Sequence, residues 1–161
     1  MCRESQFLIR ILDSAYSDSD HAWHGPTLSS SILVLPLAEV IWRPGGAEHN
    51  IWEIALHTGY WKHVALSGLT GAKQGSFPRS GSDWFVRPGE DGDPWPEDIL
   101  LLDRLHADLI AAVALVTPEA LEVIPDGSQV SNFTLISGVA AHDAYHAGQI
   151  QSIRQWYNAA Q

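Results

Sequence analysis

Apolar residues recur every three to four positions in four long segments of this chain, the spacing that places them on one face of an α-helix. The segments cover about residues 4–16, 50–67, 96–116 and 131–156. A fifth stretch, at about 27–37, contains Pro36 and should be short or bent, because proline interrupts a helix. No strand-like alternation of useful length competes with these segments. The pattern therefore predicts an all-α protein, a bundle of four long helices with short extra helices.

The residues at the segment ends support these boundaries. Asn50 and Ser131 are suitable N-caps, and Thr117-Pro118 is a sequence at which a helix ends. The stretch 68–96 is rich in Gly, Pro, Ser and Asp, which is typical of a loop. It also contains four large aromatic residues, Phe77, Trp84, Phe85 and Trp95. We therefore expect a long ordered loop that packs on the bundle.

Composition narrows the class of protein further. With 161 residues, 45% of them hydrophobic, the chain should form a single domain over 1–161 with its own core. Its single cysteine excludes a disulfide framework and a cysteine-based zinc site. A formal net charge of −10 would repel a phosphate backbone, so nucleic acid is not an expected partner. No secretion signal or membrane-spanning stretch is evident, and we expect a cytoplasmic protein.

Two histidines in the last segment, His142 and His146, have the spacing of two ligands of one metal ion. Four helical residues separate positions by about 40° around the axis and about 6 Å along it, so both rings can reach one ion. The chain has eight histidines, however, and a pair with this spacing also fits a solvated helix edge. A third ligand has to come from elsewhere in the chain.

His57, in the segment 50–67, is the candidate for that third ligand. If this helix faces the last one across the core, three imidazoles meet and leave coordination positions open, as a catalytic metal site requires. The alternative is that His57 is a buried histidine held by a hydrogen bond. Glu53 shares the face of His57 and is either a general base or the acceptor that orients a neighbouring imidazole.

Three other polar residues each have more than one assignment. His24 precedes Gly-Pro at the start of the 27–37 stretch and is a further metal ligand, a substrate contact or a helix-capping residue. Gln149 follows His146 by three residues and contacts either a bound ligand or the core. Asp143 lies about 100° around the helix from His142 and is expected to face solvent or to support a ligand. The remaining histidines considered are interpreted as bystanders: His49, His63 and His106.

Several of these features occur together in a known family. The motifs, in chain order, are Trp23-His24-Gly25-Pro26, Ile51-Trp52-Glu53-Ile54-Ala55-Leu56-His57 and His142-x-x-x-His146-x-x-Gln149. In them the chain resembles the DinB/YfiT-like proteins over nearly its whole length. The resemblance implies an up-down-down-up four-helix bundle, commonly a homodimer. It also implies one divalent metal ion, held by His57, His142 and His146.

The resemblance and the histidines lead to two main hypotheses of function. The first is a metal-dependent enzyme, in which zinc, nickel, iron or manganese activates a low-molecular-weight thiol or water toward a small electrophilic substrate. Such thiol transfer needs no catalytic cysteine, which agrees with a chain that has only Cys2. The second is a non-catalytic metal-binding helical dimer that acts as a binding or stress-response module. A helical dimer without bound metal is a third option.

Overall fold

The structure is a computed structural model that describes residues 1–17, 20, 22–71, 77–81, 83–85 and 94–161. Every regular element among these residues is a helix, which confirms the predicted all-α class. In chain order the helices are α1 (Arg3–Tyr16), α2 (Leu28–Ile32), α3 (Leu37–Ile41), α4 (Ile51–Thr70), α5 (Trp95–Leu115), α6 (Pro118–Glu122) and α7 (Asn132–Ala159).

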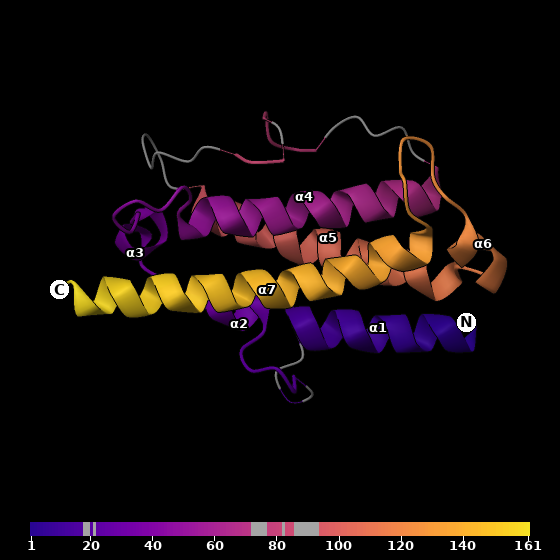
Figure 1. Ribbon diagram of the computed structural model, residues 1–161, viewed down its shortest axis with the longest axis horizontal. Coiled ribbons are helices and arrows are strands. Elements are labelled where there is room, and N and C mark those ends of the chain that lie inside the picture. The colour runs from indigo at the N-terminus through magenta and orange to yellow at the C-terminus, as the bar shows by residue number, and fades with distance from the viewer. Residues whose placement is uncertain (18–19, 21, 72–76, 82, 86–93) are drawn as a thin grey trace.

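The four long helices, α1, α4, α5 and α7, lie side by side (Figure 1). Helix α4 packs against α5 and α7, and α1 packs against the same two helices from the other side. Figure 1 shows α4 and α5 running in one direction and α1 and α7 in the opposite direction. Because α4 and α7 are direct neighbours, side chains from both can meet along one seam.

The start of α4 is held by a reciprocal pair of hydrogen bonds. The Asn50 side-chain oxygen accepts from the backbone N–H of Glu53 at 2.9 Å, and the Glu53 carboxylate accepts from the backbone N–H of Asn50 at 3.1 Å. This capping box satisfies two N–H groups that the first turn of a helix leaves without partners. The predicted N-cap is therefore confirmed, and one role of Glu53 is structural.

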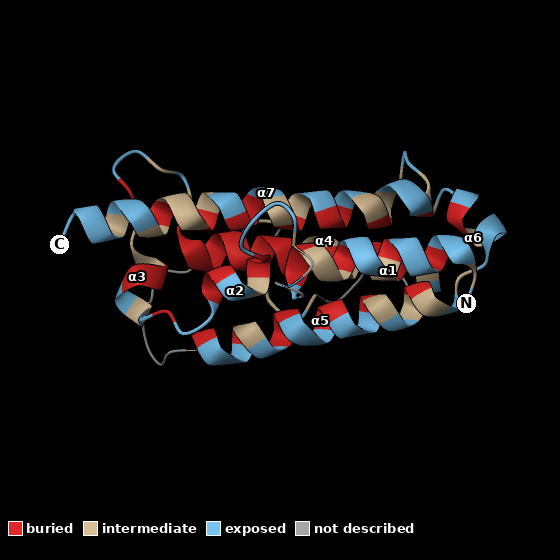
Figure 2. Cartoon of the chain, turned by 90° about the horizontal axis from the view of Figure 1, so that it is seen from below, coloured by how far each residue is buried: buried red, intermediate tan, exposed pale blue. Residues whose placement is uncertain are grey.

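The first half of α4 lies in the core. Residues 51–59 are all buried, and Figure 2 shows this helix largely in the colour of buried residues. One apolar cluster surrounds this half of the helix, and a second lies toward the other end of the bundle, around Leu12, Leu109 and Ile136. The burial of 51–59 has a consequence for function, because it carries the polar side chain of His57 into the interior.

Three short segments differ in detail from the sequence expectation. The 27–37 stretch contains α2 and the start of α3, separated by the turn that ends at Pro36. Helix α6 was not predicted, although Thr117 caps it and Pro118 occupies its first turn. Of the predicted 68–96 loop, residues 68–70 belong to α4 and residues 95–96 to α5, and Phe85 within the loop is buried, as expected for a packed loop. Residues 72–76, 82 and 86–93 of that loop lie outside the described part of the chain.

A buried ion pair joins α4 to α7. The Lys62 ammonium donates to the Asp143 carboxylate, and both side chains are fully buried. The ammonium also lies 4.7 Å from the centre of the Tyr16 ring on α1. The expectation that Asp143 faces solvent or supports a ligand is thus corrected, because its side of α7 faces the core.

None of the described helices has the length and apolar character needed to cross a membrane.

Candidate metal centre

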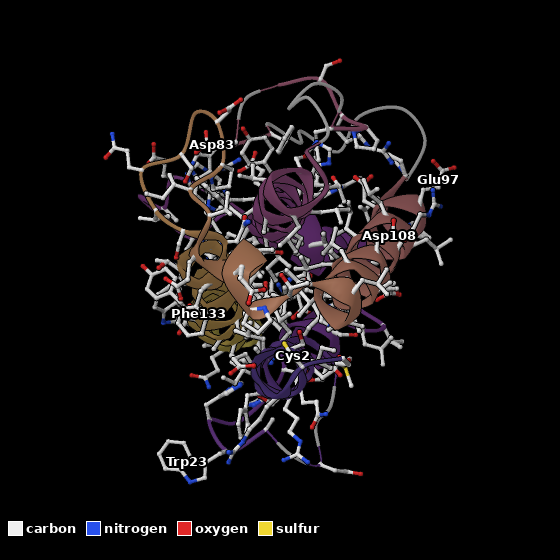
Figure 3. The ribbon with its side chains drawn as sticks, turned by 90° about the vertical axis from the view of Figure 1, so that its right-hand side faces the viewer. Cys2, Trp23, Asp83, Glu97, Asp108 and Phe133 are labelled. Carbon is white, nitrogen blue, oxygen red and sulfur yellow. The ribbon has the colours of Figure 1, made fainter. Side chains whose placement is uncertain are left out.

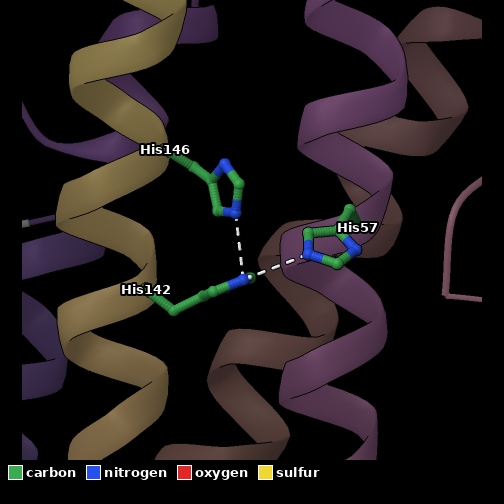
Figure 4. Close-up of side chains that lie close together, drawn as sticks. All are labelled: His57, His142 and His146. Carbon is green, nitrogen blue, oxygen red and sulfur yellow. Dashed lines mark hydrogen bonds between the residues drawn. The ribbon is translucent and has the colours of Figure 1, made fainter. Parts of the chain in front are cut away.

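Three histidines meet at the seam between α4 and α7. His57 comes from α4, and His142 and His146 come from successive turns of α7 (Figure 4). Nε2 of His142 lies 3.1 Å from Nε2 of His57 and 2.9 Å from Nε2 of His146. The structure therefore brings together the three residues that the sequence singled out as ligands. Within the described part of the chain, no fourth His, Cys, Asp or Glu side chain joins this group.

The hydrogen bonds of two rings determine where their protons lie. Nδ1 of His57 is 2.8 Å from the backbone oxygen of Asp83, which can only accept, so Nδ1 carries the proton. Nδ1 of His146 is 2.6 Å from Oε1 of Gln149 and is likewise the donor. The Gln149 amide is oriented by a second bond, in which its Nε2 donates to the Tyr145 hydroxyl at 3.1 Å. Both Nε2 atoms therefore present lone pairs toward His142.

In this arrangement a conflict arises at His142, because two acceptor nitrogens face its Nε2 and it cannot donate a hydrogen bond to both. A neutral His142 has one ring proton and can satisfy only one of the two Nε2 atoms beside it. Its Nδ1 is buried and has no hydrogen-bond partner among the described residues. A cation that accepts all three Nε2 lone pairs removes the conflict. The donor set therefore fits a metal ion better than it fits a hydrogen-bonded core.

The two separations that involve Nε2 of His142 also fit a divalent metal. With metal–nitrogen bonds of about 2.0–2.1 Å, two ligand nitrogens are about 2.9 Å apart at a right angle and about 3.3 Å apart at the tetrahedral angle. The observed separations of 2.9 Å and 3.1 Å lie in this range. Three imidazoles suit zinc, nickel, iron or manganese, and the geometry does not select among them.

The protonation states of the three rings are those that metal binding requires. Burial, reinforced by the neighbouring histidines, lowers the pKa of His142 to about 3. Burial likewise lowers the pKa of His146 to about 4, against the opposing effect of its bond to Gln149. The pKa of His57 is also lowered by burial, although its bond to Asp83 opposes the shift. Near pH 7 the rings are therefore neutral, which is the form that binds metal.

A cavity of about 650 Å³, which we call the polar cavity, opens onto the histidine cluster. Its walls combine polar and aromatic side chains, among them Glu48, His49, Trp84, Tyr145, Gln149 and Trp156. An ion on three protein ligands beside such a space would keep coordination positions accessible to small molecules. This is the arrangement of a catalytic metal site, since structural zinc sites are closed by a fourth protein ligand.

The loop residues Asp83 and Trp84 hold His57 from outside the bundle. The Trp84 indole lies between two imidazoles, with ring centres 3.6 Å from His49 and 3.8 Å from His57 and with planes parallel to within 4°. The sequence predicted a packed loop but not its contacts with His57, and it assigned no role to His49, which stacks on Trp84 and lines the polar cavity. For His49 one local signal existed, because Glu53 follows it by four residues.

Glu53 and His24 occupy different surroundings from the histidine cluster. Glu53 accepts a hydrogen bond from Arg43 at 2.8 Å, and its Oε2 lies 3.6 Å from Nδ1 of His49. His24 is exposed in the turn before α2 and does not line the polar cavity. Its neighbour Trp23 projects from the bundle on the side opposite Asp83 (Figure 3). The structure thus does not bring His24 to the cluster, and a substrate contact by this residue stays a prediction.

Comparison with known proteins places the chain in a family. The sequence model of the DinB superfamily matches residues 23–150, a range that contains all three clustered histidines. No significant match to a curated protein or to a solved structure accompanies it. The family match covers well over half of the 161 residues and agrees with the all-helical architecture. On this basis the chain belongs to the DinB superfamily.

Proposed function

We propose that this protein is a metal-dependent enzyme in which a divalent ion on His57, His142 and His146 activates a thiol or water toward a small electrophilic substrate. The observation that carries the proposal is the convergence of three Nε2 atoms beside an open cavity of about 650 Å³. We also propose that the long helices form the up-down-down-up bundle of the family, which the helix directions in Figure 1 support.

A bound divalent ion would act as a Lewis acid that makes a thiol or water a better nucleophile near neutral pH. Asp83 keeps a proton on Nδ1 of His57, and Gln149 keeps one on Nδ1 of His146, so the Nε2 lone pairs of these two rings are free to bind the ion. In thiol transfer, sulfur bonds to the electrophilic carbon and the leaving group departs with the electron pair of its bond. The thiol proton must pass to a base.

We propose His49 as that base. Its ring lines the polar cavity, and 24% of its side chain is exposed. Oε2 of Glu53 lies 3.6 Å from Nδ1 of His49, and its negative charge would stabilise the protonated imidazole. Glu53 is almost fully buried and does not line the polar cavity, which supports a role exerted through His49. Glu53 is thus proposed as a positioning residue.

Metal content and turnover measured on one sample test the proposal. We expect protein purified without chelator to contain close to one metal ion per chain by mass spectrometry. It should accelerate the conjugation of 2-mercaptoethanol to 1-chloro-2,4-dinitrobenzene or the hydrolysis of 4-nitrophenyl acetate. Chelation should abolish the acceleration and added metal should restore it. Acceleration that survives complete removal of the metal would contradict the proposal.

The alternative is a non-catalytic, metal-binding homodimer. It is favoured by large apolar side chains exposed on α7, namely Phe133, Tyr145 and Trp156, which a second copy of the chain would cover. Metal-loaded protein that sediments as a dimer and accelerates neither reaction would support this alternative. A dimer that does accelerate them is compatible with the enzyme.

The role of Gln149 gives a separate prediction. If Gln149 acts by orienting His146, Gln149→Ala should lower metal affinity by about 10- to 100-fold, the loss typical of replacing a residue that hydrogen-bonds to a metal ligand. Ser152→Ala, one turn further along α7 and also in the cavity wall, is the matched control and should keep the metal affinity. If Gln149 binds substrate instead, KM should rise while metal affinity is retained. Competition with a chromophoric chelator and steady-state kinetics separate these outcomes.

A further inference from the structure

A second cavity, of about 410 Å³, adjoins the histidine cluster. It shares His57 and His142 with the polar cavity, and its other walls are Trp61 of α4 and Thr134, Leu135, Gly138 and Val139 of α7. The polar cavity extends the other way along α7, past His146 toward Trp156. The metal-ligand cluster thus lies between two spaces that approach it from opposite halves of α7.

The two spaces differ in chemistry. Glu48, Tyr145, Gln149 and Ser152 give the first cavity charged and hydrogen-bonding groups. Apart from the two imidazoles and the Thr134 hydroxyl, the second is walled by an indole, aliphatic side chains and a glycine. We call it the apolar pocket. Its size falls in the range of small-molecule sites, and such walls favour uncharged apolar groups over charged ones.

We propose that the apolar pocket binds the alkyl or aryl part of the electrophilic substrate, whose reactive carbon then lies at the His57 and His142 edge. The thiol or water would enter through the polar cavity, so that the two reactants meet at the cluster from different sides. The inference rests on the proposed function and adds the class of substrate, an uncharged electrophile with an apolar group. The sulfur of the thiol or the oxygen of water would bond to the reactive carbon, the leaving group would depart with the electron pair of its bond, and the nucleophile's proton would pass to the base.

Gly138 offers a way to fill the pocket without disturbing the core. It is exposed on α7, and a Cβ atom placed there meets no atom within 4 Å. Gly148 on the same helix is also exposed, has the same free space and lines neither cavity. Leucine is a better helix former than glycine, so both Gly138→Leu and Gly148→Leu should fold. Only the first places a side chain at the pocket wall.

The test is the binding of 1-butanol, 1-hexanol and 1-octanol, measured by NMR titration on metal-free and zinc-loaded protein. For the wild type and Gly148→Leu we expect affinity to rise about fourfold for each added methylene, the increment for burying one such group. For Gly138→Leu the affinity should no longer rise with chain length. Wild-type affinity that is independent of chain length, or an unchanged rise in Gly138→Leu, would overturn the inference.

Zinc content measured on the same samples keeps this inference distinct from the proposed function. Gly138→Leu should bind zinc as the wild type does, because it replaces no ligand. Alkanol binding to a protein that takes up no metal would overturn the proposed function and leave the apolar pocket supported. Normal zinc binding together with alkanol affinity that does not depend on chain length would overturn the apolar-pocket inference and leave the proposed metal site supported.

Discussion

Replacement of His142 by alanine is expected to lower zinc affinity by more than about 100-fold. This exceeds the loss typical of replacing a residue that only hydrogen-bonds to a metal ligand. His142 is the central member of the cluster, with its Nε2 within 3.1 Å of the Nε2 atoms of both other histidines. Without it, His57 and His146 would remain as two ligands from different helices. Competition with a chromophoric chelator measures the change, and circular dichroism verifies that the helices persist.

His63→Ala is the matched control for this prediction. His63 is a partly buried histidine of α4 that packs edge-on against Phe77 and is not a member of the cluster. It should keep zinc affinity within about twofold of the wild type, since surface or peripheral changes have small effects. Equal losses in His63→Ala and His142→Ala, or zinc affinity within tenfold of the wild type in His142→Ala, would show that the ion binds elsewhere.

The largest effect on stability is expected from Asp143→Leu, which should cost about 3–5 kcal/mol of unfolding free energy. The substitution removes the only carboxylate whose hydrogen bond to the Lys62 ammonium is seen among the described residues, and leaves that ammonium buried. Urea denaturation followed by circular dichroism measures the loss. Asp108→Leu, an exposed position on α5, is the control and should change stability by no more than about 0.5 kcal/mol.

The double variant Lys62→Met/Asp143→Leu separates loss of the ion pair from loss of packing. It removes both charges and keeps apolar bulk at both positions, and such replacements of a buried pair are often neutral or stabilising. We therefore expect it to recover most of the stability that Asp143→Leu loses. Burial lowers the pKa of Lys62, with the charge of Asp143 opposing the shift. A cost below about 1 kcal/mol for Asp143→Leu would indicate that Lys62 becomes neutral at little cost.

The local sequence was sufficient for the helices and for two of the three candidate metal ligands. Periodicity and capping residues located α1, α4, α5 and α7 to within a few residues, because both depend on neighbours within one or two turns. The spacing of His142 and His146 likewise determined that their rings share a face. His57 was the candidate third ligand from its place in the 50–67 segment, and the family resemblance, which the superfamily match confirms, favoured that role over a buried histidine held by a hydrogen bond.

Only the tertiary structure decided how these parts meet. The described part of the loop places Asp83 and Trp84 against His57, although they are 26 and 27 positions away in the sequence. The packing of α4 against α7 pairs Lys62 with Asp143 and opens a cavity on either side of His142. Such contacts depend on helix orientation and loop path, and helical periodicity carries information about neither. The sequence by itself thus determined which residues share a helix face, and the three-dimensional packing decided what each face contacts.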